Sequence, residues 1–274
     1  MSGVLLISLD SLWIRLSEVS SWDVAFWVGA FTFLTISMVL PLTTRRSIVA
    51  VVRDDGTPLL VSSILNTCSV TMFIVAIGIT TVSNVVAIVA AAPVAAAVVA
   101  RLLIREQPSR RTWLAIAGSV VGILIIVGGS IGSGTVTGDL IAIVAVLAFA
   151  GNVTLWRRYP DISRLAVIGL GGLFTALATV IPADPLSVGG GSLAILAVMG
   201  VATGPTGRVS LASSTRFLSA AQVGLFTPVE TVAATTWAWM FLAEAPPPAT
   251  IVGGLLVIAA VAYGTRRRRV ASVS

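Results

Sequence analysis

The sequence predicts an all-α integral membrane protein with ten transmembrane helices in two inverted five-helix repeats. Three observations lead to this fold class: long apolar stretches, arginines in every second gap between them, and a turn pattern that recurs in both halves. Of the 274 residues, 57% are hydrophobic and only 10% are charged, whereas soluble domains carry roughly a quarter charged residues. So few charges cannot cover a water-exposed surface, and much of the surface must therefore face lipid.

The apolar stretches have the length and pattern of membrane helices. About 20 residues cross the hydrocarbon core as a helix, and a helix satisfies its own backbone hydrogen bonds in lipid. Strands of a membrane barrel would alternate in hydrophobicity over about 10 residues, and these stretches do not alternate. The ten predicted spans are residues 4–16, 25–42, 59–79, 82–104, 113–127, 140–156, 165–181, 193–209, 220–242 and 250–263.

The arginines predict the orientation of the chain. All 17 basic residues are arginines, and only Arg15 lies outside every second gap. Because basic loops stay in the cytoplasm, we expect a multi-pass protein of the cytoplasmic (inner or plasma) membrane with both termini cytoplasmic. The basic gaps and the tail contain Arg45, Arg46, Arg53, Arg101, Arg105, Arg110, Arg111, Arg157, Arg158, Arg164, Arg208, Arg216 and Arg266 to Arg269.

The two halves repeat a span, a turn and a second span that contains glycine. Glu106 and Glu244 begin the equivalent turns, and each is followed two residues later by a proline. Asn84 and Gln222 lie the same number of residues upstream of these glutamates. Five spans per half is an odd number, so the halves have opposite orientations, which is typical of transporters. We expect a first repeat over residues 1–129, a second over 130–265, and a basic cytoplasmic tail over 266–274.

Asp10 is an acid inside the first predicted span. A charged group at mid-membrane costs about 2.5–3.5 kcal/mol on insertion scales and usually faces a cavity or a partner. Asp10 and Trp13 lie three residues apart and share a helix face. Two interpretations stay open: a carboxylate that binds substrate or proton, or an interfacial acid in a short span.

Glu230 is the stronger candidate for the substrate or proton pathway because it lies near the middle of the ninth predicted span. Helical spacing puts Thr227, Glu230 and Trp237 on one face. Pro228 removes a backbone hydrogen bond beside the carboxylate and should kink the helix. The alternative is a structural acid that pairs with a cytoplasmic arginine such as Arg216.

Four amides also lie within predicted spans, and interhelical hydrogen bonding is their ordinary role. Asn152 and Trp156, one turn apart, are the pair we expect to line the pathway. Asn66, Asn84 and Gln222 are further candidates for the pathway.

Two prolines, Pro93 and Pro228, are predicted hinges for gating, and Glu106 and Glu244 are predicted turn or gate residues.

The composition argues against several other classes of protein. The chain has no histidine and a single cysteine, Cys68, so no metal site and no internal disulfide is expected. Its arginines are dispersed among short loops, which disfavours nucleic-acid binding. No phosphate-binding loop, nucleophile–base pair or other enzyme signature is present, and no cofactor is expected.

The order of these motifs resembles the EamA-like members of the drug/metabolite transporter (DMT) superfamily. The resemblance rests on Pro93, the turn Arg105-Glu106-Gln107-Pro108 with Gly118 and Gly122 after it, Gly138-Asp139-Leu140 leading to Trp156-Arg157-Arg158, and Ala221-Gln222 through Pro228, Glu230 and Glu244. It implies ten helices in two inverted repeats around a central cavity, and export or exchange of small organic solutes. The chain departs from the family at Val28, where related sequences often carry an arginine, and at Arg105 and Ala243, where a glycine usually precedes the glutamate.

We therefore expect a secondary-active transporter that works by alternating access, as an exporter or exchanger of small organic metabolites, amino acids or drugs. Its expected partners are a small organic solute, the lipid bilayer and protons as coupling ion, and it would act as a monomer or a homodimer. The alternatives are a membrane-embedded lipid-modifying enzyme and a channel-like protein without alternating access.

Overall fold

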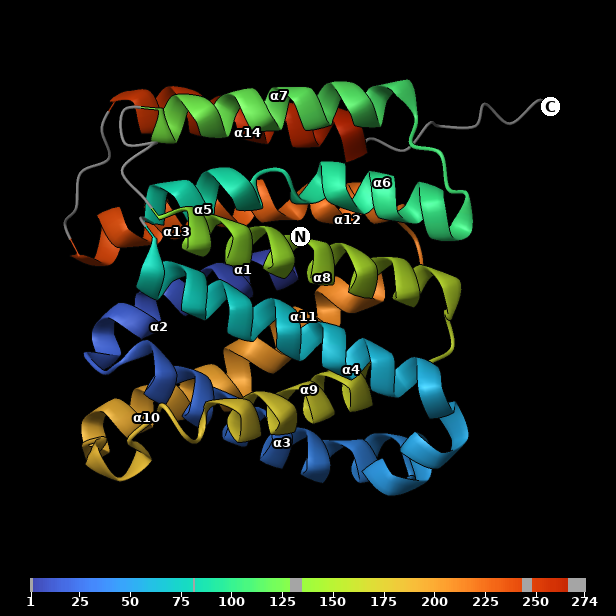
Figure 1. The fold of residues 1–274 in the computed structure, drawn as a ribbon, viewed down its shortest axis with the longest axis vertical. Coiled ribbons are helices and arrows are strands. Elements are labelled where there is room, and N and C mark those ends of the chain that lie inside the picture. Colours follow the sequence, from blue (N-terminus) through green and yellow to red (C-terminus); the bar gives the residue numbers. More distant parts are fainter. Residues whose placement is uncertain (1, 81, 129–134, 243–247, 266–274) are drawn as a thin grey trace.

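The computed structural model describes residues 2–80, 82–128, 135–242 and 248–265, and these residues form helices with no strand among them. The helices lie side by side in a bundle (Figure 1). The first half comprises α1 (Ser2–Ser8), α2 (Asp10–Ser17), α3 (Ser21–Thr44), α4 (Ile48–Ile79), α5 (Val82–Val89), α6 (Ala92–Ile104) and α7 (Arg110–Val127). The second comprises α8 (Val136–Arg158), α9 (Arg164–Thr179), η1 (Pro185–Ser187), α10 (Gly190–Val198), the π-helical η2 (Met199–Thr203), α11 (Gly204–Ser214), α12 (Ala220–Gly224), α13 (Phe226–Leu242) and α14 (Pro248–Thr265).

Each predicted span falls mainly on helix, which confirms the all-α class. Six segments of the described chain are long and apolar enough to cross a membrane. They are Ser21–Thr44, Ile48–Ile79, Asn84–Ile104, Val136–Arg158, Gly190–Ser214 and Pro248–Thr265, and Arg164–Thr179 is a shorter apolar helix. The count of ten spans and the inverted repeat stay predictions.

Serines and threonines begin many of these helices. In each case the side-chain oxygen accepts a hydrogen bond from the backbone N–H three residues later, which satisfies one of the free donors at the helix start and stabilises it by about 1 kcal/mol. The capping residues are Ser20, Ser47, Ser109, Thr135, Ser163 and Ser219.

Several predicted spans are interrupted helices. The first divides at Leu9, between α1 and α2, and the fourth divides just before Pro93, between α5 and α6. The ninth divides at Leu225, three residues before Pro228. The ring of Pro228 cannot donate the hydrogen bond that a continuous helix needs at this position, which accounts for the interruption. Gly56 takes a left-handed φ of 57° inside α4, which glycine adopts without strain.

Helices of the first half pack extensively against helices of the second half. The most extensive of these contacts join α3 with α9, α7 with α14, α4 with α8, α4 with α9, and α6 with α8, and smaller ones join α1 with α11 and α6 with α12. Glycines allow the closest of these approaches. A Cβ added at Gly172 of α9 would lie 2.7 Å from the carbonyl oxygen of Gly29 of α3. The two backbones therefore touch, as small residues allow in membrane helices.

The connections α3–α4, α6–α7 and α8–α9 lie at the same end of the bundle, on the right in Figure 1. We call it the arginine end, because these connections contain Arg45, Arg46 and Arg105, and Arg110, Arg157 and Arg158 lie at the adjoining helix ends. The opposite end is bordered by α2–α3 and by the junction of α4 with α5.

Candidate functional site

The candidate site begins at the close contact of α1 and α11. A Cβ added at Gly207 would lie 2.6 Å from Cγ1 of Ile7 and 2.9 Å from the carbonyl oxygen of Gly3. These glycines let the two helices approach until their backbones meet. The approach brings Arg208, the residue after Gly207, next to Asp10 at the start of α2.

Asp10 and Arg208 form an ion pair between the two halves of the chain. The Nη2 atom of Arg208 donates to Oδ2 of Asp10 at 3.1 Å, and the side chains are 24% and 13% exposed, respectively. The other carboxylate oxygen, Oδ1, is buried and has no hydrogen-bond partner among the described residues. The contact gives Asp10 a basic partner from the second half of the chain, and its role in binding substrate or proton stays a prediction.

Arg208 is the residue of this site that sequence reasoning missed. The charge pattern assigned it to a basic gap, but it lies within α11 and inside the candidate span Gly190–Ser214. The available signal was its position within the predicted span 193–209. An arginine inside a membrane span is rare and marks a paired or functional charge.

Glu230 lies next to this ion pair. The same helix, α13, packs against α1 and α2, and Trp237 donates from Nε1 to Oγ of Ser8 at 2.8 Å. Trp237 shares a face with Glu230, so this face is turned toward Asp10. The charges of Asp10 and Arg208 both act on the Glu230 carboxyl, and no described residue donates a hydrogen bond to it.

Two more polar atoms without partners lie on the elements around Asp10. The Nε1 atom of Trp13 and Oγ1 of Thr203 are buried without a hydrogen-bond partner in the described chain. Trp13 packs its ring in an apolar cluster with Val28 and Leu196. Thr203 ends the π-helical η2, which contacts α2. Buried polar atoms usually have partners, and π-helical turns are frequent at functional sites.

Asn152 and Trp156 make their contacts away from this cluster. Ser62 of α4 donates to Oδ1 of Asn152 at 2.6 Å, and Nε1 of Trp156 donates to Oγ of Ser62 at 2.8 Å. All three side chains are buried. Here the two residues connect α8 to α4, which is the interhelical role expected of membrane amides.

Asn84 and Gln222 hold helix ends. The Nδ2 atom of Asn84 donates to both carboxylate oxygens of Asp139, at 3.2 and 3.1 Å. Gln222 completes a capping box with Ser219, and its Nε2 donates to the carbonyl of Gly264 at 3.1 Å.

Asn66 packs against α9, where a Cβ added at Gly171 would lie 2.6 Å from its Nδ2. Thr227 is half-buried one turn before Glu230, and its carbonyl accepts a hydrogen bond from Thr231 at 3.3 Å.

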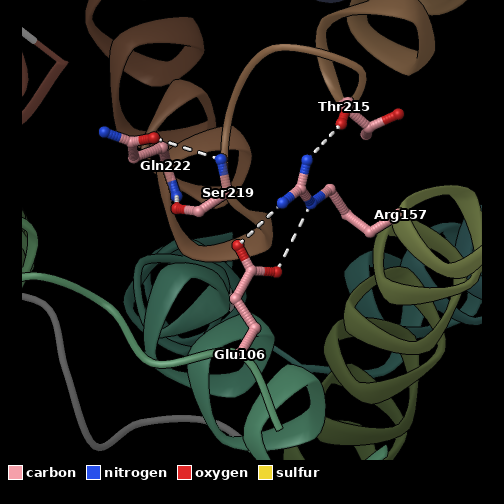
Figure 2. A network of polar contacts seen from close by, with 5 residues as sticks. All are labelled: Glu106, Arg157, Thr215, Ser219 and Gln222. Atoms are coloured by element: carbon pink, nitrogen blue, oxygen red, sulfur yellow. Dashed lines mark hydrogen bonds and ion pairs between the residues drawn. The ribbon is translucent and has the colours of Figure 1, made fainter. Parts of the chain in front are cut away.

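A second polar network closes the arginine end (Figure 2). The guanidinium of Arg157, at the end of α8, reaches both oxygens of Glu106, with Nη2···Oε1 at 3.3 Å and Nε···Oε2 at 3.4 Å. Its Nη1 donates to the carbonyl of Thr215 at 3.0 Å. We call these three residues the Glu106 latch. It joins the ends of α6, α8 and α11, and the gate role of Glu106 stays a prediction. Glu244 lies outside the described residues.

Arg164 reinforces the same end from a buried position. Its guanidinium donates to the carbonyls of Pro160, Ile162 (3.0 Å) and Trp156 (3.2 Å), and Nη2 lies 3.5 Å from Oγ1 of Thr215. It precedes the predicted span 165–181. Burial, followed by the charge of Arg216, lowers the pKa of Arg164 from its ordinary value.

The two predicted hinge prolines are both buried. Pro93 lies at the start of α6, directly against α12: a Cβ added at Gly224 would lie 2.7 Å from the Cα of Pro93. The interruption of α5–α6 thus touches the interruption of α12–α13.

A pocket at the opposite end of the bundle contains none of the predicted site residues. It is lined by Ser21, Trp22, Ile74, Val75, Gly78 and Ile79, from α3 and α4. Within the described ranges, no three acidic, cysteine or histidine residues gather in a way that could hold a metal ion.

Comparison with known proteins gives one family and one fold. Residues 3–128 match the EamA-like transporter family. A crystal structure of another protein superimposes with a TM-score of 0.82 at 15% sequence identity, and the match covers 96% of this chain and 93% of that one. The similarity shows that the two share a fold. No curated protein matches the sequence.

Proposed function

Residues 3–128 of the chain belong to the EamA-like transporter family, and on this premise we propose a secondary-active transporter that works by alternating access. It exports or exchanges small organic metabolites, amino acids or drugs, with protons as the coupling ion. It works in the cytoplasmic (inner or plasma) membrane as a monomer or a homodimer.

The observation that carries the proposal is the cluster of Asp10, Arg208 and Glu230. Asp10 and Arg208 pair at 3.1 Å within an apolar bundle, and Glu230 lies on α13, which packs against α1 and α2. Ionisable groups inside membrane segments are costly, and they mark substrate paths and proton relays. The cluster joins α2 of the first half to α11 and α13 of the second, and transporters bind solutes at such an interface between repeats.

The packing of the helices supports two inverted repeats over residues 1–129 and 130–265. If each half contributes five spans in the same order, α3 corresponds to α9 and α7 to α14, and both of these corresponding pairs are in contact. The contact of α6 with α12 corresponds to that of α13 with α5. The contact of α4 with α8 likewise corresponds to that of α11 with α1. A two-fold relation between the halves accounts for these contacts together.

The charge of the loops supports an arginine end that faces the cytoplasm. In this orientation the Glu106 latch closes the cytoplasmic side over the cluster. Alternating access then requires this latch to open, and the helix interruptions at Pro93 and Leu225 are the points where the bundle can bend.

Counterflow in proteoliposomes tests the proposal. Vesicles loaded with candidate metabolites, amino acids or drugs should take up the labelled solute faster than empty vesicles, and saturably. A channel-like protein without alternating access shows no such acceleration. Glu230→Gln should abolish the flux at normal membrane abundance. Glu18→Gln, the same change at an exposed glutamate, should leave the flux intact. Flux that survives Glu230→Gln would remove Glu230 from the proposal.

A further inference from the structure

We propose that Asp10, Arg208 and Glu230 select a solute with a single positively charged head group, and that Arg208 is an internal counter-ion that this head group displaces from Asp10. The inference rests on the proposed function, since it assigns the substrate class of the same site.

The first argument is the charge of the site. Asp10 and Arg208 form one neutral ion pair, so ionisation of Glu230 leaves one negative charge that has no ion-pair partner among the described residues. An unpaired charge in a medium of low dielectric constant is costly. A monovalent cation restores neutrality, whereas a carboxylate or phosphate adds a second unbalanced charge.

The second argument is the geometry around Asp10. Arg208 occupies Oδ2 only, while Oδ1 is buried and without a partner among the described residues. An ammonium group carries several donors, so it can bond to Oδ1 and to the Glu230 carboxylate. The guanidinium already supplies positive charge here, and the arriving cation competes with it for Asp10.

The third argument is the apolar wall beside the acids. Trp13 lies one turn after Asp10, and the ring of Trp237 is held against α1 by the 2.8 Å bond to Ser8. Aromatic faces attract cations and pack against apolar bodies. The solute class is therefore an amine with an apolar or aromatic body.

Binding of three matched probes to the purified protein in detergent tests the inference. Benzylammonium, benzyl alcohol and benzoate share one ring and differ in charge. We expect saturable binding of benzylammonium and none of benzoate. Because Arg208→Gln removes the competing cation, it should tighten benzylammonium binding about tenfold, which corresponds to about 1.4 kcal/mol. Asp10→Asn should weaken binding and abolish the effect of Arg208→Gln in the double variant.

Two controls keep the result specific. Arg208→Lys keeps the positive charge and should bind benzylammonium like the unchanged protein. Arg216→Gln, the same change at an exposed arginine after α11, should leave binding unchanged. Benzoate binding that Arg208→Gln abolishes would overturn the inference, since Arg208 would then be an anion receptor. Absence of benzylammonium binding would also overturn the inference, as would an equal affinity for benzylammonium with and without Arg208.

The binding experiment does not require transport, so its result is independent of the result of the counterflow experiment. A preference for benzoate alongside saturable counterflow refutes only the substrate class. Selective benzylammonium binding without counterflow refutes only the transport mechanism.

Discussion

Glu106→Gln should open the arginine end of the bundle. The substitution keeps the shape of the side chain and removes the charge that faces Arg157 at 3.3 and 3.4 Å. The Glu106 side chain is 15% exposed and the Arg157 side chain is 30% exposed. Solvent therefore screens the pair less than it would on an open surface. Exposed pairs contribute about 0–1 kcal/mol, and hydrogen bonds to charged groups contribute about 1.5–3 kcal/mol. For this half-buried pair we expect a loss of about 1–2 kcal/mol from the closed state.

A loss of that size changes the ratio of closed to open molecules by about 5- to 30-fold. A cysteine at Ala220 reports it, because Ala220 is fully buried in the core between α6, α8 and α12. In a Cys68→Ser background it is the only thiol in the chain. A membrane-impermeant maleimide, added to inside-out vesicles, should label this thiol faster in the Glu106→Gln variant by the same factor.

Arg158→Gln is the matched control. Arg158 neighbours Arg157, is exposed, and bonds to the carbonyl of Leu103 instead of Glu106. Its loss should leave the labelling rate unchanged. Equal labelling of the Glu106→Gln variant and the parent would refute the latch, and equal acceleration by Arg158→Gln would attribute the effect to general loosening.

Three further substitutions test the packing of the bundle by thermal unfolding in detergent. Gly172→Ala should destabilise the fold by about 1–3 kcal/mol, because its Cβ would lie 2.7 Å from a backbone oxygen of α3; an unchanged midpoint would refute the backbone contact. Trp156→Phe should cost about 1 kcal/mol through loss of the hydrogen bond to Ser62, and Ser62→Ala in the same variant should add less than it does alone. Ser219→Ala should cost about 1 kcal/mol by removing the cap of α12, whereas Ser187→Ala, at an exposed position outside the α-helices, should not.

Local chemistry in the sequence predicted the helices and two of the three charges of the site. Asp10 and Glu230 are rare acids within apolar stretches, so each is conspicuous by itself. Arg208 is not, because an arginine near the end of a span normally anchors a loop. Its role depends on Asp10, a residue 198 positions away in the chain. Only the glycine contact of α1 with α11 brings the two together, and no pattern within one helix encodes that contact.

The amides show which contacts the sequence could not predict. The repeat pairs Asn84 with Gln222, and their position within spans made both candidates for the pathway. In the structure Asn84 bonds to Asp139, and Gln222 bonds to the carbonyl of Gly264. Asn84 and Gln222 therefore share a position in the repeat but have different hydrogen-bond partners, because those partners lie on other helices. The interruption at Leu9 was equally unpredictable, since neither proline nor glycine lies beside it.

The seat of Gly224 on Pro93 has a mechanical consequence. The two broken helices rest on each other at their weakest points, and no side chain separates them. A change in the bend of one interrupted helix therefore moves the other, so the two halves of the chain bend at one shared point. A larger side chain at Gly224 should restrict the bending of both helices.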